Sequence, residues 1–240
     1  MIQETEGIVL HSIKYGETSL IVSILTPELG LQKFMVHGVR SARAKIPASL
    51  FQAGSIVDLI GYIRPNRGIQ LLKEVKSNYH QQRIPFQIVH SSMALFIIEI
   101  TNKSLLESDP NTDLYKLLRQ TLIQLDSQEY ASPDWHLRYF AGLISHLGFM
   151  PEGQYSEETP YLDMLEGCFG PCAPNHVYAL SLHEAQCFSS LFDSWEFQSD
   201  SNSYLERQAL LEHLITYAKL HIQNLRELNS PEILKMVLQA

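Results

Sequence analysis

Three cysteines and a histidine in the second half of the chain have side chains of the types that bind zinc. Cys168 and Cys172 are separated by three residues, and His183 and Cys187 follow at a spacing of four, which places them on one face of a helix. Thiolate and imidazole are the usual ligands of a tetrahedral zinc ion. No second tight cysteine pair accompanies the first, so we adopt the alternative of ordinary thiols in a loop rich in Pro and Gly. We therefore expect no metal and no cofactor.

Cations in the first third of the chain suit a different chemistry, the binding of a polyanion. Residues 1–83 carry ten Lys or Arg against six Asp or Glu, whereas residues 84–240 carry eight against twenty, and the formal net charge is −8. Single-stranded nucleic acid is bound by cations along its phosphates and by aromatic rings under its bases. Chance clustering of solvated charges is the alternative. The predicted DNA-binding residues are Lys33, Arg40, Arg43, Lys45, Arg64, Arg67, Lys73 and Lys76.

Strand and loop geometry distinguishes the members of this set. Arg40, Arg43 and Lys45 lie in a connector, which can direct all three to one side. Lys73 and Lys76 differ by three positions and would point to opposite faces of a regular strand. The candidate stacking platforms are Tyr15, Phe34 and Tyr62, and we expect Phe34 to lie in the core.

The sequence lacks the short motifs that mark common catalytic and nucleotide-binding sites. It holds no P-loop, no GxGxxG, no GxSxG and no HExxH. Catalytic groups can also assemble from distant segments, but nothing here points to such a set. We expect a protein that is not an enzyme and has no catalytic residues.

The cations must be positioned by short β-strands. Five runs rich in β-forming residues, at 8–15, 18–26, 31–39, 56–64 and 69–76, are separated by turn residues. A longer connection between the third and fourth runs is typical of an OB-fold barrel, although a small SH3-like barrel fits the strand count almost as well.

After residue 83 the apolar residues recur every three or four positions, which predicts helices. Ser203 and Glu206 match a capping box at the start of the clearest helix. The sequence therefore predicts an α+β protein, with an OB-fold DNA-binding domain at residues 1–80 followed by an all-helical C-terminal domain at residues 81–240. Prolines interrupt residues 151–180, where we expect an irregular loop region.

No apolar run approaches the roughly 18 residues that a membrane-spanning helix needs, and the N-terminus lacks the pattern of a secretory signal. Three cysteines form no disulfide framework in a chain of this length. We expect a soluble protein of a reducing cytoplasm.

Several segments resemble the RecO family of bacterial recombination mediators. The segments EGIVLHSIKYGETSLIV at 6–22, LTPELG at 25–30 and VHGVRSAR at 36–43 are similar to the opening of the family. LISHLGFMP at 143–151 resembles its LLxxLGYxP helix end, and YAKLH at 217–221 and LNSPEIL at 228–234 resemble its C-terminal segments.

The resemblance implies an OB-fold with a helical domain, binding of single- and double-stranded DNA, and strand annealing in the bacterial nucleoid. It also implies the partners RecR and single-stranded DNA-binding protein, so that RecA is loaded during gap and break repair. The family's basic connector maps onto Arg40, Arg43 and Lys45. Many members carry a four-cysteine zinc module where this chain has residues 151–180, a degenerate version with only Cys168 and Cys172.

The acidic tail of single-stranded DNA-binding protein would suit a groove on the helical domain where a cation lies near apolar side chains. Our candidate partner-binding residues are Lys116, Arg119 and Arg138. Two other functions stay open at this point. One is a non-catalytic protein-interaction adaptor with little intrinsic DNA affinity, and the other is a metal-dependent enzyme that uses Cys168 and Cys172.

Reversing the charge of the connector with Arg40→Glu, Arg43→Glu and Lys45→Glu should weaken binding to single-stranded DNA without unfolding the protein, because phosphate contacts supply much of the affinity. A titration with a labelled oligonucleotide measures the change. Unchanged affinity would count against the connector as the binding site.

Overall fold

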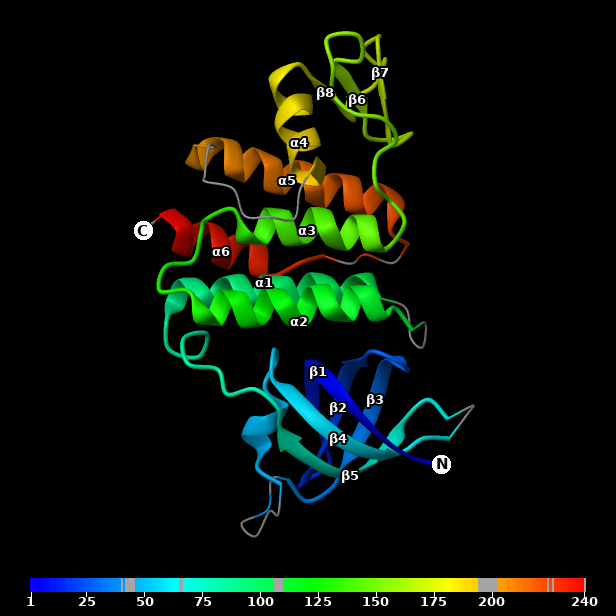
Figure 1. Ribbon diagram of the computed structural model, residues 1–240, viewed down its shortest axis with the longest axis vertical. Helices are drawn as coiled ribbons and strands as arrows, with labels where there is room; N and C mark the ends of the chain where they lie inside the picture. Colours follow the sequence, from blue (N-terminus) through cyan, green and yellow to red (C-terminus); the bar gives the residue numbers. More distant parts are fainter. Residues whose placement is uncertain are drawn as a thin grey trace. The chain divides into compact units, whose positions relative to one another are not determined.

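The computed structural model describes residues 1–39, 41, 46–64, 67–105, 110–193, 203–223, 225 and 227–239 (Figure 1). The chain forms two compact units, residues 1–129 and 130–240. The first unit holds a β-barrel and the two helices that follow it. The domain boundary expected near residue 80 stays a prediction.

The barrel consists of five strands: β1 (Ile2–Tyr15), β2 (Ser19–Thr26), β3 (Gly30–Val36), β4 (Ile56–Tyr62) and β5 (Gln70–Ser77). It is closed in the order β1-β2-β3-β5-β4, and β1 pairs with both β2 and β4. The pairing of β3 with β5 is parallel and the others are antiparallel. This order confirms the OB-like barrel and decides against the SH3-like alternative.

Alternation of apolar residues explains how the barrel is filled. In β2, Leu20, Val22 and Ile24 point inward and pack with Phe34 from β3, which is fully buried as expected. A short 3₁₀ helix, η1 (Ala48–Phe51), lies in the connection between β3 and β4 and adds the buried Phe51 to this core. The interior is therefore a packed core that leaves ligands only the outer surface.

Two helices cover part of that outer surface. Ile8, Leu25 and Ile56 point away from the barrel interior, as their inward-facing neighbours require, and yet are at most 1% exposed. Helix α1 (Ile88–Ser104) contacts β1, and α2 (Thr112–Ser127) contacts β2 and α1 (Figure 1). Both helices carry many buried apolar residues, so this side of the barrel is closed to ligands.

A buried carboxylate ties the segment between β5 and α1 to α2. Asp126 is 1% exposed and accepts 2.8 Å hydrogen bonds from the backbone N–H groups of residues 82–84. The Tyr79 hydroxyl donates to the same carboxylate at 3.1 Å. Burial alone would raise the pKa of Asp126, but these hydrogen bonds favour the charged form, and the pKa lies below its ordinary value.

The second unit contains helices α3 (Trp135–His146), α4 (His183–Asp193), α5 (Tyr204–His221) and α6 (Ser230–Gln239). The predicted capping box is present at the start of α5, where Ser203 accepts from the Glu206 N–H group and the Glu206 side chain accepts from the Ser203 N–H group. The fold class, a barrel followed by helices, is confirmed. In the described part of the chain, no helix is long and apolar enough to cross a membrane.

The region expected to be irregular, residues 151–180, carries three short strands among its turns. They are β6 (Tyr161–Asp163), β7 (Cys168–Gly170) and β8 (Ala179–Ser181), in the order β7-β6-β8. Each strand has three residues, too few to show an alternating pattern in the sequence. The prolines stand between the strands and not within them.

Two segments that carry the family resemblance meet in this unit. The Tyr217 hydroxyl donates to the backbone carbonyl of Phe149 at 3.0 Å, and the His221 Nε2 donates to the carbonyl of Met164 at 2.8 Å. Tyr217 and His221 belong to YAKLH, and Phe149 belongs to LISHLGFMP. These motifs therefore serve the packing of α5 on the segment that follows α3.

Replacing Asp126 by Asn should lower the free energy of unfolding by about 2 kcal/mol at neutral pH, because buried N–H groups lose a charged acceptor. The pKa of Asp126 is lowered in the folded state, so its contribution is present above the unfolded-state pKa of about 4 and is lost as the pH falls through the folded-state value. Urea unfolding at several pH values should show the gap between parent and variant closing in acid.

The matched control is Asp113→Asn, which removes a carboxylate that is largely exposed on the same helix. It should change stability by only a few tenths of a kcal/mol. An Asp126→Asn variant as stable as the parent at neutral pH would contradict the anchoring role.

Candidate nucleic-acid interface

The outward side chains of residues 11–15 of β1, 19–23 of β2 and 33–35 of β3, with His37 after β3, form one continuous surface, which we call the β1–β2–β3 face. Strand register places its members in three rows across the strands. One row is apolar, with Ile13 opposite Ile21 and Ile21 opposite Met35. The other two rows are His11, Ser23 and Lys33 on one side, and Tyr15, Ser19 and His37 on the other. None of these nine residues is acidic.

Exposed rings and apolar chains on this face could lie under nucleic-acid bases. Tyr15 is 55% exposed at the end of β1, next to a hairpin turn in which Gly16 has a φ of +62°, a conformation that favours glycine. Ile13 is 47% exposed. The apolar row continues onto β5 and β4, because Met35 lies opposite Leu71 and Leu71 opposite Tyr62. Of the predicted platforms, Tyr15 and Tyr62 are therefore accessible.

Three connections border this face. The β1–β2 hairpin and the connection that follows β3 leave the barrel side by side, since Leu20 pairs with Val36. The base of the β4–β5 hairpin lies beside β3, where Gln70 is opposite Phe34. Arg64 and Arg67 of the β4–β5 hairpin are therefore placed at the border of the face.

The cations of the hairpins are accessible. Arg64 and Arg67 of the β4–β5 hairpin and Lys14 beside the β1–β2 turn are exposed. Within the described ranges, no carboxylate lies within ion-pair distance of these three. Lys33 lies half-buried in the middle of the face. Lys14 was missed from sequence, although its place before a tyrosine and a glycine turn is the signal that could have found it.

A buried glutamine holds the β4–β5 hairpin and was also missed. The Gln70 side chain is 4% exposed, accepts from the Arg64 N–H group at 2.9 Å and donates to the carbonyl groups of Arg64 and Arg67 at 3.1 and 2.8 Å. It therefore fixes the backbone of both arginines. A lone glutamine at the start of a strand gives no sequence signal for such a role.

The connector cations Arg40, Arg43 and Lys45 lie outside the described residues, so their part in DNA binding stays a prediction. The start of the connector is described, with Gly38 at a φ of +72° and the Ser41 N–H and hydroxyl groups both donating to the Gly38 carbonyl.

Lys73 and Lys76 differ from the other predicted cations because each has a carboxylate partner. A bulge opposite Ile60 and Gly61 leaves Lys73 without a cross-strand partner, so the strand is not regular at this point, and both lysines are exposed. Lys73 lies 3.0 Å from Glu74, and Lys76 lies 3.6 Å from Asp58. The hydrogen bond to Glu74 and its charge raise the pKa of Lys73.

The sequence-predicted zinc ligands lie in two separate places. Cys168 is on β7 and Cys172 is exposed in the turn after it, whereas His183 and Cys187 are on α4 with their Nδ1 and Sγ atoms 3.6 Å apart. Among the described residues, no group of three or more His, Cys, Asp or Glu side chains could hold a metal ion. Burial, followed by the charges of nearby carboxylates, raises the pKa of Cys168.

Hydrogen bonds hold the loop around β6 and β7. Asp163 accepts from the backbone N–H groups of Leu165 and Glu166 at 2.9 and 3.0 Å, and His176 Nε2 lies 3.1 Å from its other oxygen. Sequence reasoning did not identify this pair. Function without zinc stays a prediction.

The candidate partner-binding cations lie in both compact units. Lys116 and Arg119 are on α2 in the first, and Arg138 is on α3 in the second. Lys116 pairs with Asp113 at 3.2 Å, and Arg119 pairs with Glu6 of β1 at 3.0 Å. Arg119 therefore joins α2 to the barrel, which competes with a partner's carboxylate. The partner-binding role of all three stays a prediction.

Two family models match consecutive parts of the chain. The family described as recombination protein O N terminal matches residues 1–79, and the family described as recombination protein O C terminal matches residues 85–229. Curated relatives named DNA repair protein RecO include that of Phocaeicola vulgatus, 32% identical over 237 residues, and that of Flavobacterium psychrophilum, 31% identical over 238 residues. In both cases the alignment covers 98% of this chain and 98% of the relative.

Replacing Arg64 and Arg67 by Gln should weaken oligonucleotide binding and reduce the slope of log affinity against log salt by about one for each phosphate that is no longer neutralised. The matched pair, Lys73→Gln with Lys76→Gln, removes the same charge from residues that already have carboxylate partners, and its effect should be smaller. Fluorescence anisotropy over a salt series measures both. Equal losses of affinity would assign the binding to overall charge and not to this face.

Proposed function

The chain belongs to the RecO family of DNA repair proteins, and from this premise we propose that it binds single- and double-stranded DNA and anneals complementary strands without catalysing a covalent reaction. The observation that carries the proposal is the β1–β2–β3 face, which has no carboxylate among its outward residues and is bordered by exposed arginines. The acidic residue that lies nearest to these outward residues along the sequence is Glu17, at the tip of the β1–β2 hairpin.

The chemistry of the face suits a single strand of any sequence. Arg64 and Arg67 can contact phosphates, and such contacts position a strand without reading its bases. Tyr15 and the apolar row offer surfaces for stacking, which every base can use. A protein that anneals strands needs both properties, because it must hold arbitrary sequences without blocking the edges that pair.

The distribution of charge supports different ligands for the barrel and the helices. Residues 84–240 carry eight Lys or Arg against twenty Asp or Glu, and this excess of negative charge disfavours contact with phosphates. We propose that the helices serve protein partners: RecR and single-stranded DNA-binding protein, with RecA loaded as the outcome. The acidic tail of single-stranded DNA-binding protein would require a cation beside an apolar surface, and Lys116, Arg119 and Arg138 are our candidates. The proposed site of action is the bacterial nucleoid in the cytoplasm.

A second function is favoured by one observation, the carboxylate partners of Lys73 and Lys76. If the barrel cations are largely neutralised, the protein is a non-catalytic adaptor with little intrinsic DNA affinity. Absence of DNA binding at low salt, together with retained binding to RecR, would favour the adaptor.

The decisive experiment is annealing of complementary strands that are coated with single-stranded DNA-binding protein, with and without this chain. We expect the chain to accelerate annealing, and the Arg64→Gln, Arg67→Gln variant to lose much of that acceleration while the Lys73→Gln, Lys76→Gln variant keeps it. Annealing at the uncatalysed rate in the presence of the parent protein would refute the proposal.

A further inference from the structure

The neighbouring part of the barrel surface shares Leu71 and Tyr62 with the apolar row described above, but it also carries carboxylates that the DNA-binding proposal does not use. The outward residues of β1, β4 and β5, which we call the β1–β4–β5 face, also lie in rows set by strand register. An apolar row consists of Ile2, Tyr62 and Leu71, which are 56%, 36% and 39% exposed. Beside it, Glu4 is opposite Ile60 and Ile60 is opposite Glu74. The next row is Glu6, Asp58 and Lys76.

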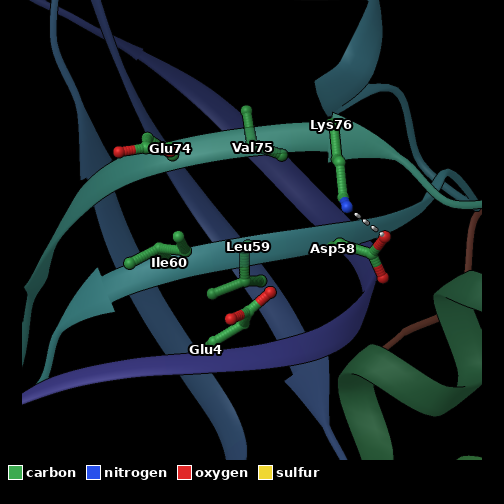
Figure 2. Close-up of a pocket in the computed structure, with 7 residues that line it drawn as sticks. All are labelled: Glu4, Asp58, Leu59, Ile60, Glu74, Val75 and Lys76. Carbon is green, nitrogen blue, oxygen red and sulfur yellow. Dashed lines mark ion pairs between the residues drawn. The ribbon is translucent and has the colours of Figure 1, made fainter.

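A groove of about 150 Å³ lies on this face. Figure 2 shows that Glu4, Ile60 and Glu74 come from three neighbouring strands, with the Lys76–Asp58 ion pair further along the same strands. An apolar side chain, Ile60, thus separates two carboxylates. The exposed row of Ile2, Tyr62 and Leu71 lies next to the row of Glu4, Ile60 and Glu74 on the same three strands.

The charges of the face are incompletely matched. Glu6 pairs with Arg119, Asp58 with Lys76 and Glu74 with Lys73, whereas Glu4 has no cationic partner within the described part of the chain. The Lys73–Glu74 pair is exposed, with side chains 40% and 61% accessible. Exposed pairs contribute little stability, so Glu74 can exchange its partner for an incoming cation at small cost.

We infer that the β1–β4–β5 face is a docking surface for a protein segment that presents Lys or Arg side chains beside apolar ones. The carboxylates Glu4 and Glu74 would receive the cations, and Ile60 with the neighbouring apolar row would receive the apolar groups. Charge complementarity selects this occupant.

The same carboxylates argue against a nucleic acid on this face. A phosphate chain laid along the rows would approach Glu4, Asp58 and Glu74 within the roughly 8–10 Å over which charges act at physiological salt. Lys73 and Lys76 on this face form ion pairs with Glu74 and Asp58, so they add little net attraction for phosphates. DNA and a basic protein segment can therefore bind different faces of one barrel.

The probe for the test is a short fluorescein-labelled peptide of alternating Arg and Val, with a Glu–Val peptide of opposite charge for comparison. The parent protein should bind the Arg–Val peptide more tightly, with NMR amide shifts at residues 58–62 and 70–76. An Arg–Gly peptide of equal charge should bind more weakly, because it lacks apolar groups for the row of Ile2, Tyr62 and Leu71.

The Glu4→Gln, Glu74→Gln variant should lose about fivefold in affinity for the Arg–Val peptide, within the range expected from two exposed ion pairs. Glu157→Gln with Glu158→Gln makes the same change in net charge at exposed residues of the second unit, and it should leave the affinity unchanged. Equal losses in the two variants, or equal binding of the two peptides of opposite charge, would overturn the inference.

A parallel oligonucleotide titration separates this inference from the proposed function. The Glu4→Gln, Glu74→Gln variant should bind single-stranded DNA as well as the parent or better. Loss of DNA binding in this variant, with thermal unfolding unchanged, would place the face in the DNA path and refute its assignment to a protein.

Discussion

The register in which five strands close into a barrel determines where every outward side chain of this domain lies. Each strand must direct alternate residues to a core built around Phe34, Val22 and Leu59, and the residues between them are then fixed on the outside. The parallel contact of β3 with β5 joins the two halves of the sheet. A shift of one residue in any pair would move the core side chains outward and rearrange both outer faces.

This constraint gives neighbouring faces of one small barrel opposite chemical character. The β1–β2–β3 face has no outward carboxylate, and the β1–β4–β5 face has several. Since charges are screened over about 8–10 Å at physiological salt, a ligand responds to the face it touches and not to the formal net charge of −8. Whole-chain charge is therefore a poor guide to what this protein binds.

Much of the fold could be predicted from the sequence, because turns and apolar periodicity are local signals. The capping box of Ser203 and Glu206 and the burial of Phe34 are examples. The partners of charged residues were not predictable, since they depend on cross-strand register. Lys73 and Lys76 look like free cations in the sequence, yet a bulge and the neighbours Glu74 and Asp58 change their role. The hydrogen bond between Asp163 and His176 was likewise not predictable, because only the folded loop brings the two side chains together.

The amide of Gln70 has a consequence for how a strand of nucleic acid would be held. Its three hydrogen bonds to the backbone of Arg64 and Arg67 reduce the conformations that this backbone samples before any ligand arrives. Less conformational entropy is then lost when the guanidinium groups engage phosphates, which is the general advantage of preorganisation. If Arg64 and Arg67 bind DNA as proposed, a buried side chain of the barrel would thereby increase the affinity of the complex without contacting the nucleic acid.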